Sequence, residues 1–449
     1  MASERGALFD PTFGGDFIAP LVGDRAWVTA MFDVEGALSR AAATVGLVDV
    51  GHAGIVTTAA AELGTSTDIT RLGLDAAAGG NPVIPLVTML RKAVSPSAVP
   101  PSAVHPGATS QDIMDTALML VSRNALVAIE AALDDACRAA RDLALAHRTT
   151  PMAARTLGQQ ALPTTFGLVA ANWASGLYRV RTHLTAVRQA CPVQYGGAAG
   201  TLAAVYPHGR TIAAALAGEL GLAQQVAPWH TERTAIADIA CALGTAAGSI
   251  GKIAGDIVSM SATELGELSE DAPGGSSAMP HKRNPVAAIT ARAATRRVPG
   301  TVSTVLSNMD HEHQRAAGAW HAEWESITDL LRLTGGAAHR IATSLGGLHV
   351  HSENMARNLD ATGGALLAER VTGALAPHTD RARDIVTARC AAGAPLDTDP
   401  AITEFLAPST VRELLDPAAY LGHAPELVDA LLSEQHFGTD NTTDSKGSA

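Results

Sequence analysis

The strongest structural signal in the chain is the stretch from Ser110 to His147, which contains neither glycine nor proline. Asp112 and Asp115 lie near its start, where carboxylates stabilise the positive end of a helix dipole. At a rise of 1.5 Å per residue, the pattern predicts a continuous helix roughly 55 Å long. Only neighbouring helices can cover the apolar stripe of so long a helix, so the pattern predicts a bundle. The stripe consists of Leu133, Cys137, Ala140 and Ala144.

The composition favours an all-α protein. Apolar residues make up 47% of the 449 residues but aromatic residues only 4%, so Ala, Leu, Val and Ile must fill the core. Such a core suits closely packed helices. A chain of this length exceeds one compact core, and we expect two or three domains. A second long helix is predicted from Glu232 to about Ser269.

Glycines recur within that second helix at spacings of four, three and four, which places them on one helix face. A face almost without side chains suits the close approach of another helix, which compensates for the poor helix propensity of glycine. That approach can occur within one chain or between subunits. The glycines are Gly244, Gly248, Gly251 and Gly255.

The net charge of -12 argues against a nucleic-acid surface, because such a surface needs basic residues to displace counterions from phosphates. Any anionic ligand must therefore meet a local cluster of cations. The four cysteines show no metal-ligand spacing, which is typical of reduced thiols in a cytoplasmic protein. We also expect no signal peptide and no membrane span, because polar residues, proline and glycine interrupt the uncharged runs.

Residues 274–285 read Gly-Gly-Ser-Ser-Ala-Met-Pro-His-Lys-Arg-Asn-Pro. The two glycines allow backbone conformations closed to other residues, so a serine can be presented at the tip of a loop. Lys282 supplies a cation for a carboxylate, and Asn284 supplies donors for an oxyanion. By composition alone, an ordinary surface loop and a catalytic loop fit this segment about equally.

The string resembles the signature loop of the fumarase and aspartase superfamily, Gly-Ser-Ser-x-Met-Pro-x-Lys-x-Asn. Its His-Lys-Arg-Asn form is similar to the branch that contains adenylosuccinate lyase and 3-carboxy-cis,cis-muconate cycloisomerase. The resemblance implies three helical domains, at residues 1–109, 110–350 and 351–449, with a long-helix bundle in the central one. It further implies a homotetramer whose active sites draw on three subunits, and no cofactor or metal.

The segment from His105 to Asp112, His-Pro-Gly-Ala-Thr-Ser-Gln-Asp, resembles another motif of the same branch. Taken alone, Thr109 and Ser110 would be a plain N-cap of the long helix. The resemblance implies instead that their hydroxyls and the helix N-terminus bind a substrate carboxylate. It also makes His105 a candidate for proton transfer.

The segment from Arg155 to Ala161, Arg-Thr-Leu-Gly-Gln-Gln-Ala, resembles the superfamily pattern Arg-Thr-His-x-Gln-x-Ala, with leucine at the histidine position. In lyases such as adenylosuccinate lyase, that histidine is the general acid for the leaving group. General-acid help is worth about 10²- to 10⁴-fold for an amine or hydroxide, whereas a carboxylate leaves as a stable anion. Leu157 therefore predicts a stable anionic leaving group, unless His105 or His281 supplies the proton.

Together these resemblances imply a cycloisomerase that converts 3-carboxy-cis,cis-muconate to 4-carboxymuconolactone in protocatechuate catabolism. Ser276 would donate the proton to carbon, with Lys282 and His105 assisting. A small polycarboxylate would be the only partner besides other subunits. Two alternatives remain open: a lyase that releases nitrite from nitrosuccinate, and a helical scaffold without turnover. The residues expected to bind the substrate are Thr109, Ser110, Arg155, Thr156, Gln160, Asn284 and Arg315.

His311 and His313 form a His-x-His pair near Glu312 and His321, which could be interpreted as a metal site. On a helix, however, positions 311 and 313 point to different faces, and no HExxH spacing is present. We therefore predict a structural polar network here rather than a metal centre.

Overall fold

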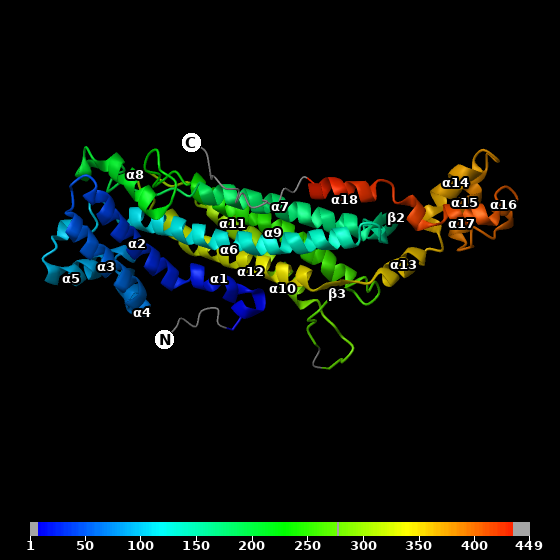
Figure 1. Cartoon of the computed structure of the whole chain (residues 1–449), viewed down its shortest axis with the longest axis horizontal. Helices are drawn as coiled ribbons and strands as arrows, with labels where there is room; N and C mark the ends of the chain where they lie inside the picture. The colour runs from blue at the N-terminus through cyan, green and yellow to red at the C-terminus, as the bar shows by residue number, and fades with distance from the viewer. Residues whose placement is uncertain (1–7, 276–277, 434–449) are drawn as a thin grey trace, which may run out of the picture. The chain divides into compact units, whose positions relative to one another are not determined.

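The computed structural model describes residues 8–275 and 278–433, and its secondary structure is almost wholly helical, as Figure 1 shows. This confirms the predicted all-α class. The chain divides into two compact units. One comprises Met1–Leu133, Arg179–Lys252 and Thr290–Arg340, and the other comprises Asp134–Tyr178, Ile253–Ile289 and Ile341–Ala449. The division into three domains at residues 109 and 350 stays a prediction.

Five helices contain a boundary between the two units: α6 (Ser110–Ala146), α7 (Phe166–Gln189), α9 (Thr234–Met260), α10 (Val286–Thr295) and α12 (Ala319–Gly346). Helix α6 confirms the prediction of one long helix beginning at Ser110. The predicted apolar stripe of Leu133, Cys137, Ala140 and Ala144 is buried along its whole length.

Helices α6 and α9 are also long and apolar enough to cross a membrane by length and composition alone. The most apolar window of α6 is 72% buried, as in the core helix of a bundle, and that of α9 is 50% buried. The predicted lack of a membrane span stays a prediction.

Helix α9 ends nine residues earlier than predicted, at Met260 instead of about Ser269. The chain turns after Met260, where Gly266 adopts a left-handed backbone with φ of 57°. Residues Leu268–Glu270 then form strand β3, which pairs with β4 (Leu348–Val350) in an antiparallel sheet. The prediction was wrong here because strand pairing with a distant segment overrides local helix propensity.

The glycine face of α9 is used for close packing within the chain at two positions. A Cβ atom on Gly244 would lie 3.1 Å from Val302, and one on Gly251 would lie 2.9 Å from the Thr295 hydroxyl. A Cβ atom on Gly248 would meet no described atom within 4 Å. Two of the glycines therefore admit a neighbouring helix of the same unit, which is the intramolecular alternative.

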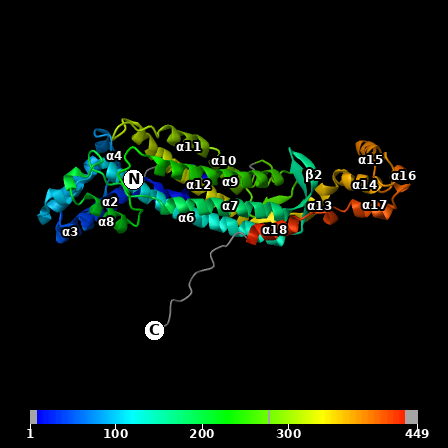
Figure 2. The ribbon, with the colours of Figure 1, turned by 90° about the horizontal axis from the view of Figure 1, so that it is seen from above.

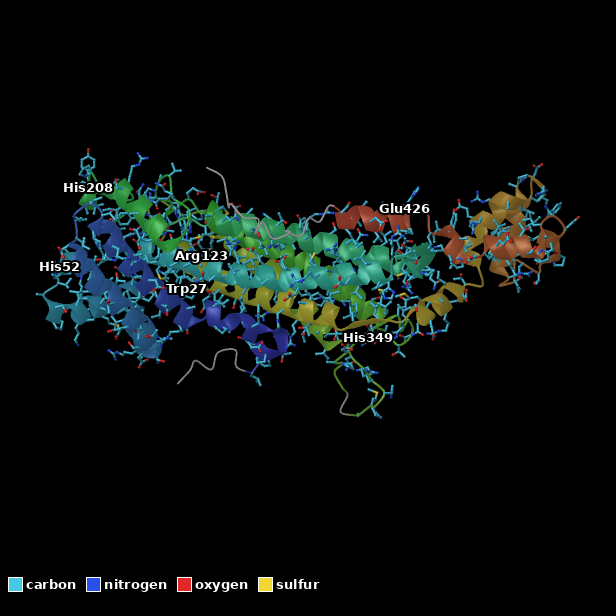
Figure 3. All side chains as sticks on the ribbon, in the orientation of Figure 1. Trp27, His52, Arg123, His208, His349 and Glu426 are labelled. Carbon is cyan, nitrogen blue, oxygen red and sulfur yellow. The ribbon has the colours of Figure 1, made fainter. Side chains whose placement is uncertain are left out.

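Among the remaining helices of the first unit, α2 contacts α1, α3, α4 and α8, and α5 packs against α3 and α4. Arg123, labelled in Figure 3, donates to the main-chain oxygen of Gly221 at 3.0 Å and so caps the C-terminus of α8. These helices are α1 (Gly15–Val22), α2 (Asp24–Ala43), α3 (Val50–Ser66), α4 (Ile69–Ala77), α5 (Val83–Val94), α8 (Gly209–Leu220) and α11 (Val298–Ser307).

The second unit adds a hairpin and six short helices. The hairpin pairs β1 (Pro151–Thr156) with β2 (Gln159–Thr165), a small sheet that the sequence did not predict. Helices α14, α15 and α17 gather in one cluster, which both Figure 1 and Figure 2 show, around a core that includes Val371, Leu375, Val386 and Ile402. The six helices are α13 (Ser352–Asp360), α14 (Ala368–Leu375), α15 (Ala382–Ala391), α16 (Pro400–Thr403), α17 (Pro408–Leu414) and α18 (Ala424–Ser433).

Candidate active site

The N-terminus of α6 is capped by its own main chain and by Asp112. The Asp112 carboxylate accepts from the Thr109 amide at 2.9 Å, and the Asp112 amide donates to the Thr109 carbonyl at 3.0 Å. This is one half of a capping box, because the Asp112 side chain binds the Thr109 amide while the Thr109 carbonyl, and not its hydroxyl, accepts from the Asp112 amide. Within the described residues, the hydroxyls of Thr109 and Ser110 have no hydrogen-bond partner and are available to a ligand.

Asp112 also ties this helix start to a second loop. Its carboxylate accepts from the amides of Gly196 and Gly197, each at 2.9 Å, and from the Nε2 atom of His230 at 2.7 Å. Because the Asp112 side chain is buried and fully hydrogen-bonded, it organises the loops and is not free to act on a substrate.

Gly107 lies where the two loops touch. Its φ of 66° is in the left-handed region, and an added Cβ would lie 2.4 Å from a Val205 methyl group and 2.9 Å from the Tyr195 hydroxyl. Only glycine therefore fits this position of the motif without displacing a buried neighbour.

Gly107→Ala is expected to lower the free energy of unfolding by about 2–3 kcal/mol, because backbone strain and a steric overlap add together. Denaturant unfolding followed by circular dichroism measures the loss. The matched control is Gly54→Ala on α3, where a Cβ meets nothing within 4 Å. This control should be neutral or gain up to about 1 kcal/mol, and equal stability of the two variants would contradict the prediction.

His105 is paired with a carboxylate that the sequence analysis did not select. Its Nδ1 atom lies 2.6 Å from Oε1 of Glu35, a fully buried residue of α2. Burial disfavours the imidazolium, but the charge and hydrogen bond of Glu35 outweigh burial, so the pKa of His105 is raised above its ordinary value.

Arg315 is held beside the start of α6 by Gln111, a residue of the motif at 105–112. Its Nε atom donates to the side-chain oxygen of Gln111 at 3.1 Å, and Gln111 in turn donates to the main-chain oxygen of His230 at 2.8 Å. The remaining donors of the Arg315 guanidinium can therefore face an anion while one edge stays fixed.

Arg233 lies at the centre of a buried charge network beneath this site. It donates to Asp115 at 2.8 Å and to Glu323 at 2.6 Å, and its side chain has no exposed area. His311 lies 3.2 Å from Glu323, but neither of its ring nitrogens has a hydrogen-bond partner among the described residues, and His313 is exposed. Residues 311–313 are not helical, so the predicted polar network that includes both histidines stays a prediction. The described residues contain no group of three or more His, Cys, Asp or Glu side chains suited to a metal ion.

In the second unit, Arg155 forms a two-pronged ion pair with Glu267. Its terminal nitrogens donate to the two carboxylate oxygens at 2.9 Å and 2.6 Å, and Glu267 is fully buried. Two of the five guanidinium donors are used, so the others stay available for a substrate carboxylate at a side chain that is 21% exposed.

Asn358 completes this cluster. Its side-chain amide donates to Glu267 at 2.8 Å, and its main-chain oxygen accepts from the side chain of Gln160 at 2.8 Å. The Gln160 side-chain oxygen is buried without a hydrogen-bond partner among the described residues. Thr156 is exposed at the end of β1, opposite Gln159.

Leu157 is the first residue of the tight turn between β1 and β2. Both turn residues have positive φ, 52° for Leu157 and 81° for Gly158, and the Leu157 side chain is fully exposed. A leucine in a left-handed conformation is strained, and such strain is typical of functional positions. The turn offers no proton donor at the position of the superfamily histidine.

The two ends of the signature loop are joined by main-chain hydrogen bonds. The amides and carbonyls of Gly274 and Asn284 pair with each other at 2.9 Å and 3.0 Å, and the Asn284 side chain donates to the Gly274 oxygen at 3.3 Å. Asn284 therefore closes the loop, while Lys282 extends into solvent. Ser276, the predicted proton-transfer residue, lies outside the described residues.

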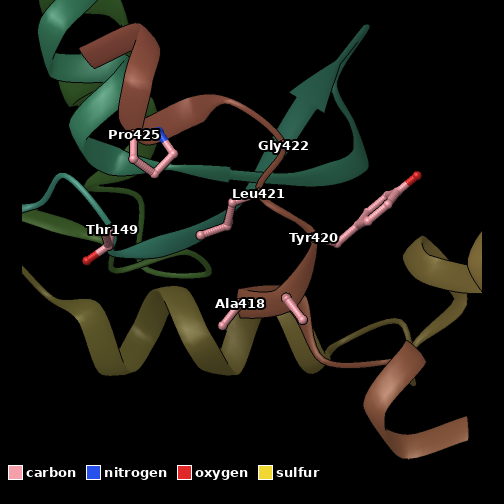
Figure 4. Close-up of a pocket in the computed structure, with 7 residues that line it drawn as sticks. Thr149, Ala418, Tyr420, Leu421, Gly422 and Pro425 are labelled. Carbon is pink, nitrogen blue, oxygen red and sulfur yellow. The ribbon is translucent and has the colours of Figure 1, made fainter. Parts of the chain in front are cut away.

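A cavity of about 730 Å³ lies in the second unit, and Figure 4 shows the residues that line it. Its lining contains no charged side chain, so it offers no cation to a polycarboxylate. The lining residues are Thr149, Ala418, Ala419, Tyr420, Leu421, Gly422 and Pro425.

Sequence reasoning missed the acidic partners of the site cations, Glu35 and Glu267. Glu35 lies in Met-Phe-Asp-Val-Glu-Gly-Ala-Leu and Glu267 in Glu-Leu-Gly-Glu-Leu, each with another acid two or three residues away. A buried carboxylate requires a charge partner, but nothing in these stretches distinguishes the buried acid from its exposed neighbour.

Comparison with known proteins identifies the family of this chain. A family model described as "Lyase" matches residues 21–300. The chain belongs to the fumarase/aspartase superfamily of lyases. It is an enzyme of that superfamily, which sets aside the alternative of an inactive scaffold.

Three relatives show how close the match is. An enzyme named nitrosuccinate lyase from Streptomyces davaonensis is 42% identical, over 94% of this chain and 93% of its own length. A 3-carboxy-cis,cis-muconate cycloisomerase from Bradyrhizobium diazoefficiens is 40% identical, over 96% of this chain and 99% of its own length. The crystal structure of the 3-carboxy-cis,cis-muconate lactonizing enzyme from Pseudomonas putida matches with a TM-score of 0.89 and 38% identity, over 95% of this chain and 98% of that one. These superfamily members match nearly the whole length of this chain.

Proposed function

We infer that this superfamily enzyme lactonises 3-carboxy-cis,cis-muconate to 4-carboxymuconolactone. The observation that carries the inference is Leu157, which leaves the turn between β1 and β2 without a proton donor. A carboxylate that attacks or leaves within the substrate needs no external acid, because its conjugate acid has a pKa of roughly 4. The similarity to several cycloisomerases over nearly the whole chain supports the same choice.

The mechanism is an anti addition across a double bond. One substrate carboxylate attacks a carbon to close the lactone, and Ser276 donates a proton to the neighbouring carbon. By microscopic reversibility, Ser276 is the base when the lactone opens. Lys282 and the loop amides stabilise the serine oxyanion. The substrate carboxylates and the intermediate are bound by Thr109, Ser110, Arg155, Thr156, Gln160, Asn284 and Arg315.

The purified protein should consume carboxymuconate with loss of the ultraviolet absorbance of its conjugated double bonds. A parallel sample with nitrosuccinate, assayed for nitrite, is the matched control for a general lyase. Abundant nitrite without any change in carboxymuconate absorbance would overturn the cycloisomerase in favour of the second candidate.

That second candidate is a nitrosuccinate lyase. It is supported by the 42% identity to an enzyme of that name, and nitrite, like a carboxylate, leaves without acid help at Leu157.

The assembly that we propose is a soluble, cytoplasmic homotetramer with active sites shared between subunits. Half of the most apolar window of α9 is unburied in the single chain, which suits coverage by another subunit. Analytical ultracentrifugation should give the mass of four chains, and a fully active monomer would contradict the proposal.

A further inference from the structure

Glu35 is an unusual carboxylate because, among the described residues, His105 is the one group with a side-chain contact to it. The residue has no exposed area, and its second oxygen, Oε2, has no partner among the described residues. A buried anion with a single contact is costly unless that contact carries positive charge. The 2.6 Å contact to Nδ1 of His105 is therefore best satisfied by an imidazolium.

The charged groups around His105 favour the same state. Glu35 on α2 and Asp112 on α6 stabilise its positive charge, whereas burial and Arg91 on α5 oppose it. The Tyr195 hydroxyl donates to the main-chain oxygen of Pro106 at 2.9 Å, and burial raises the pKa of Tyr195, so this neighbour stays neutral. The balance raises the pKa of His105.

The second nitrogen of His105 is free to act on a ligand. The side chain is 15% exposed, and Nε2 has no hydrogen-bond partner within the described part of the chain. His105 begins the motif whose Thr109 and Ser110 hydroxyls are also without a partner there. The Nε2 atom of His105 and two hydroxyls therefore lack a partner among the described residues of one short segment.

We propose that Glu35 is a positioning residue that keeps His105 an imidazolium, and that the Nε2–H of His105 binds a carboxylate of the substrate. The proposal deepens the function proposed above, on which it rests, by naming the cation at the α6 end of the site. It gives His105 a role in binding rather than as the acid that replaces Leu157. Because the raised pKa belongs to a cationic acid, the cation is present below that pKa and is lost as the pH rises through it.

The test is calorimetric titration of the unmodified enzyme with tricarballylate, a tricarboxylate that cannot react. The titration is carried out in two buffers of different ionisation enthalpy, because the difference between the two binding enthalpies gives the number of protons taken up on binding. If Glu35 keeps His105 charged as proposed, the unmodified enzyme should bind tricarballylate at pH 7 with little proton uptake. Glu35→Gln keeps a hydrogen-bond acceptor at Nδ1 but removes the charge. It should take up nearly one proton on binding, and the pH at which affinity falls should drop by about one to two units.

A matched control separates this effect from damage to the fold. Glu130→Gln removes another buried carboxylate of the first unit, which holds Arg188 at 2.6 Å and Thr185 at 2.9 Å. It should leave both the proton uptake and the pH profile of binding unchanged. If Glu35→Gln does not fold, His105→Asn is used instead. This variant should bind tricarballylate weakly at every pH, and its affinity should not change where that of the unmodified enzyme falls with rising pH.

Proton uptake and a pH profile in Glu35→Gln that equal those of the unmodified enzyme would overturn the proposal. So would a shift as large in Glu130→Gln, or no measurable binding of tricarballylate to the unmodified enzyme at pH 6. Because tricarballylate is not turned over, these outcomes are independent of the reaction. If tricarballylate binding shows the predicted proton uptake but carboxymuconate is not turned over, the result counts against the proposed cycloisomerase activity and not against the role of Glu35.

Discussion

Arg233→Leu is expected to lower the free energy of unfolding by about 3–5 kcal/mol. Arg233 has no exposed area and donates to both Asp115 and Glu323, which are themselves buried. Leucine would leave two buried carboxylates close together without a counter-charge, and that is more costly than the loss of the two ion pairs. Thermal and denaturant unfolding measure the effect.

A surface ion pair is the matched control for this prediction. Arg71 donates to Asp75 one helical turn away at 3.0 Å, and the arginine side chain is 71% exposed. Arg71→Leu should change the stability by less than about 0.5 kcal/mol, because water and salt screen such pairs. Equal losses in the two variants would show that the burial of Arg233 is not what makes its network important.

Ser276→Ala is expected to lower kcat by about 10³-fold, since the proposed mechanism loses its only proton donor to carbon. The Michaelis constant should change little, because the cations that bind carboxylates remain. Steady-state kinetics with carboxymuconate measure both quantities. Unfolding measurements should show no loss of stability, which separates lost chemistry from lost folding.

Ser277→Ala is the matched control in the same loop, with the same change in chemistry one residue away. It should retain most of the turnover. Unchanged kcat in Ser276→Ala would remove that serine from the mechanism, and equal losses in both variants would leave the loop, rather than one hydroxyl, as the origin of the effect.

The predictions that succeeded depend on local patterns. The absence of glycine and proline after Ser110 was enough to predict α6, since helix propensity and the start signals lie within the helix itself. The end of α9 was misjudged because β3 forms only by pairing with β4, whose residues lie about eighty positions further along the chain. No local pattern in 261–270 carries that information.

The same distinction applies to the candidate site. The motifs at 105–112, 155–161 and 274–285 are contiguous, so the sequence alone revealed them, together with the superfamily and the missing acid at Leu157. Their partners were not visible, because Glu35 pairs with His105 across 70 positions and Glu267 with Arg155 across 112. The role of a carboxylate can be assigned only when the fold shows which cation it pairs with.

The sequence by itself thus determined the helical class and the superfamily and supplied the candidate residues for its chemistry, because helix periodicity and short motifs depend on neighbouring positions. Only the tertiary structure decided the state of those residues. It showed that the Asp112 carboxylate binds the amide at the start of α6, that Glu267 orients Arg155, and that Glu35 pairs with His105 and raises its pKa. An ion pair that is weak in water becomes much stronger when it is buried, and these side chains are buried only in the folded chain.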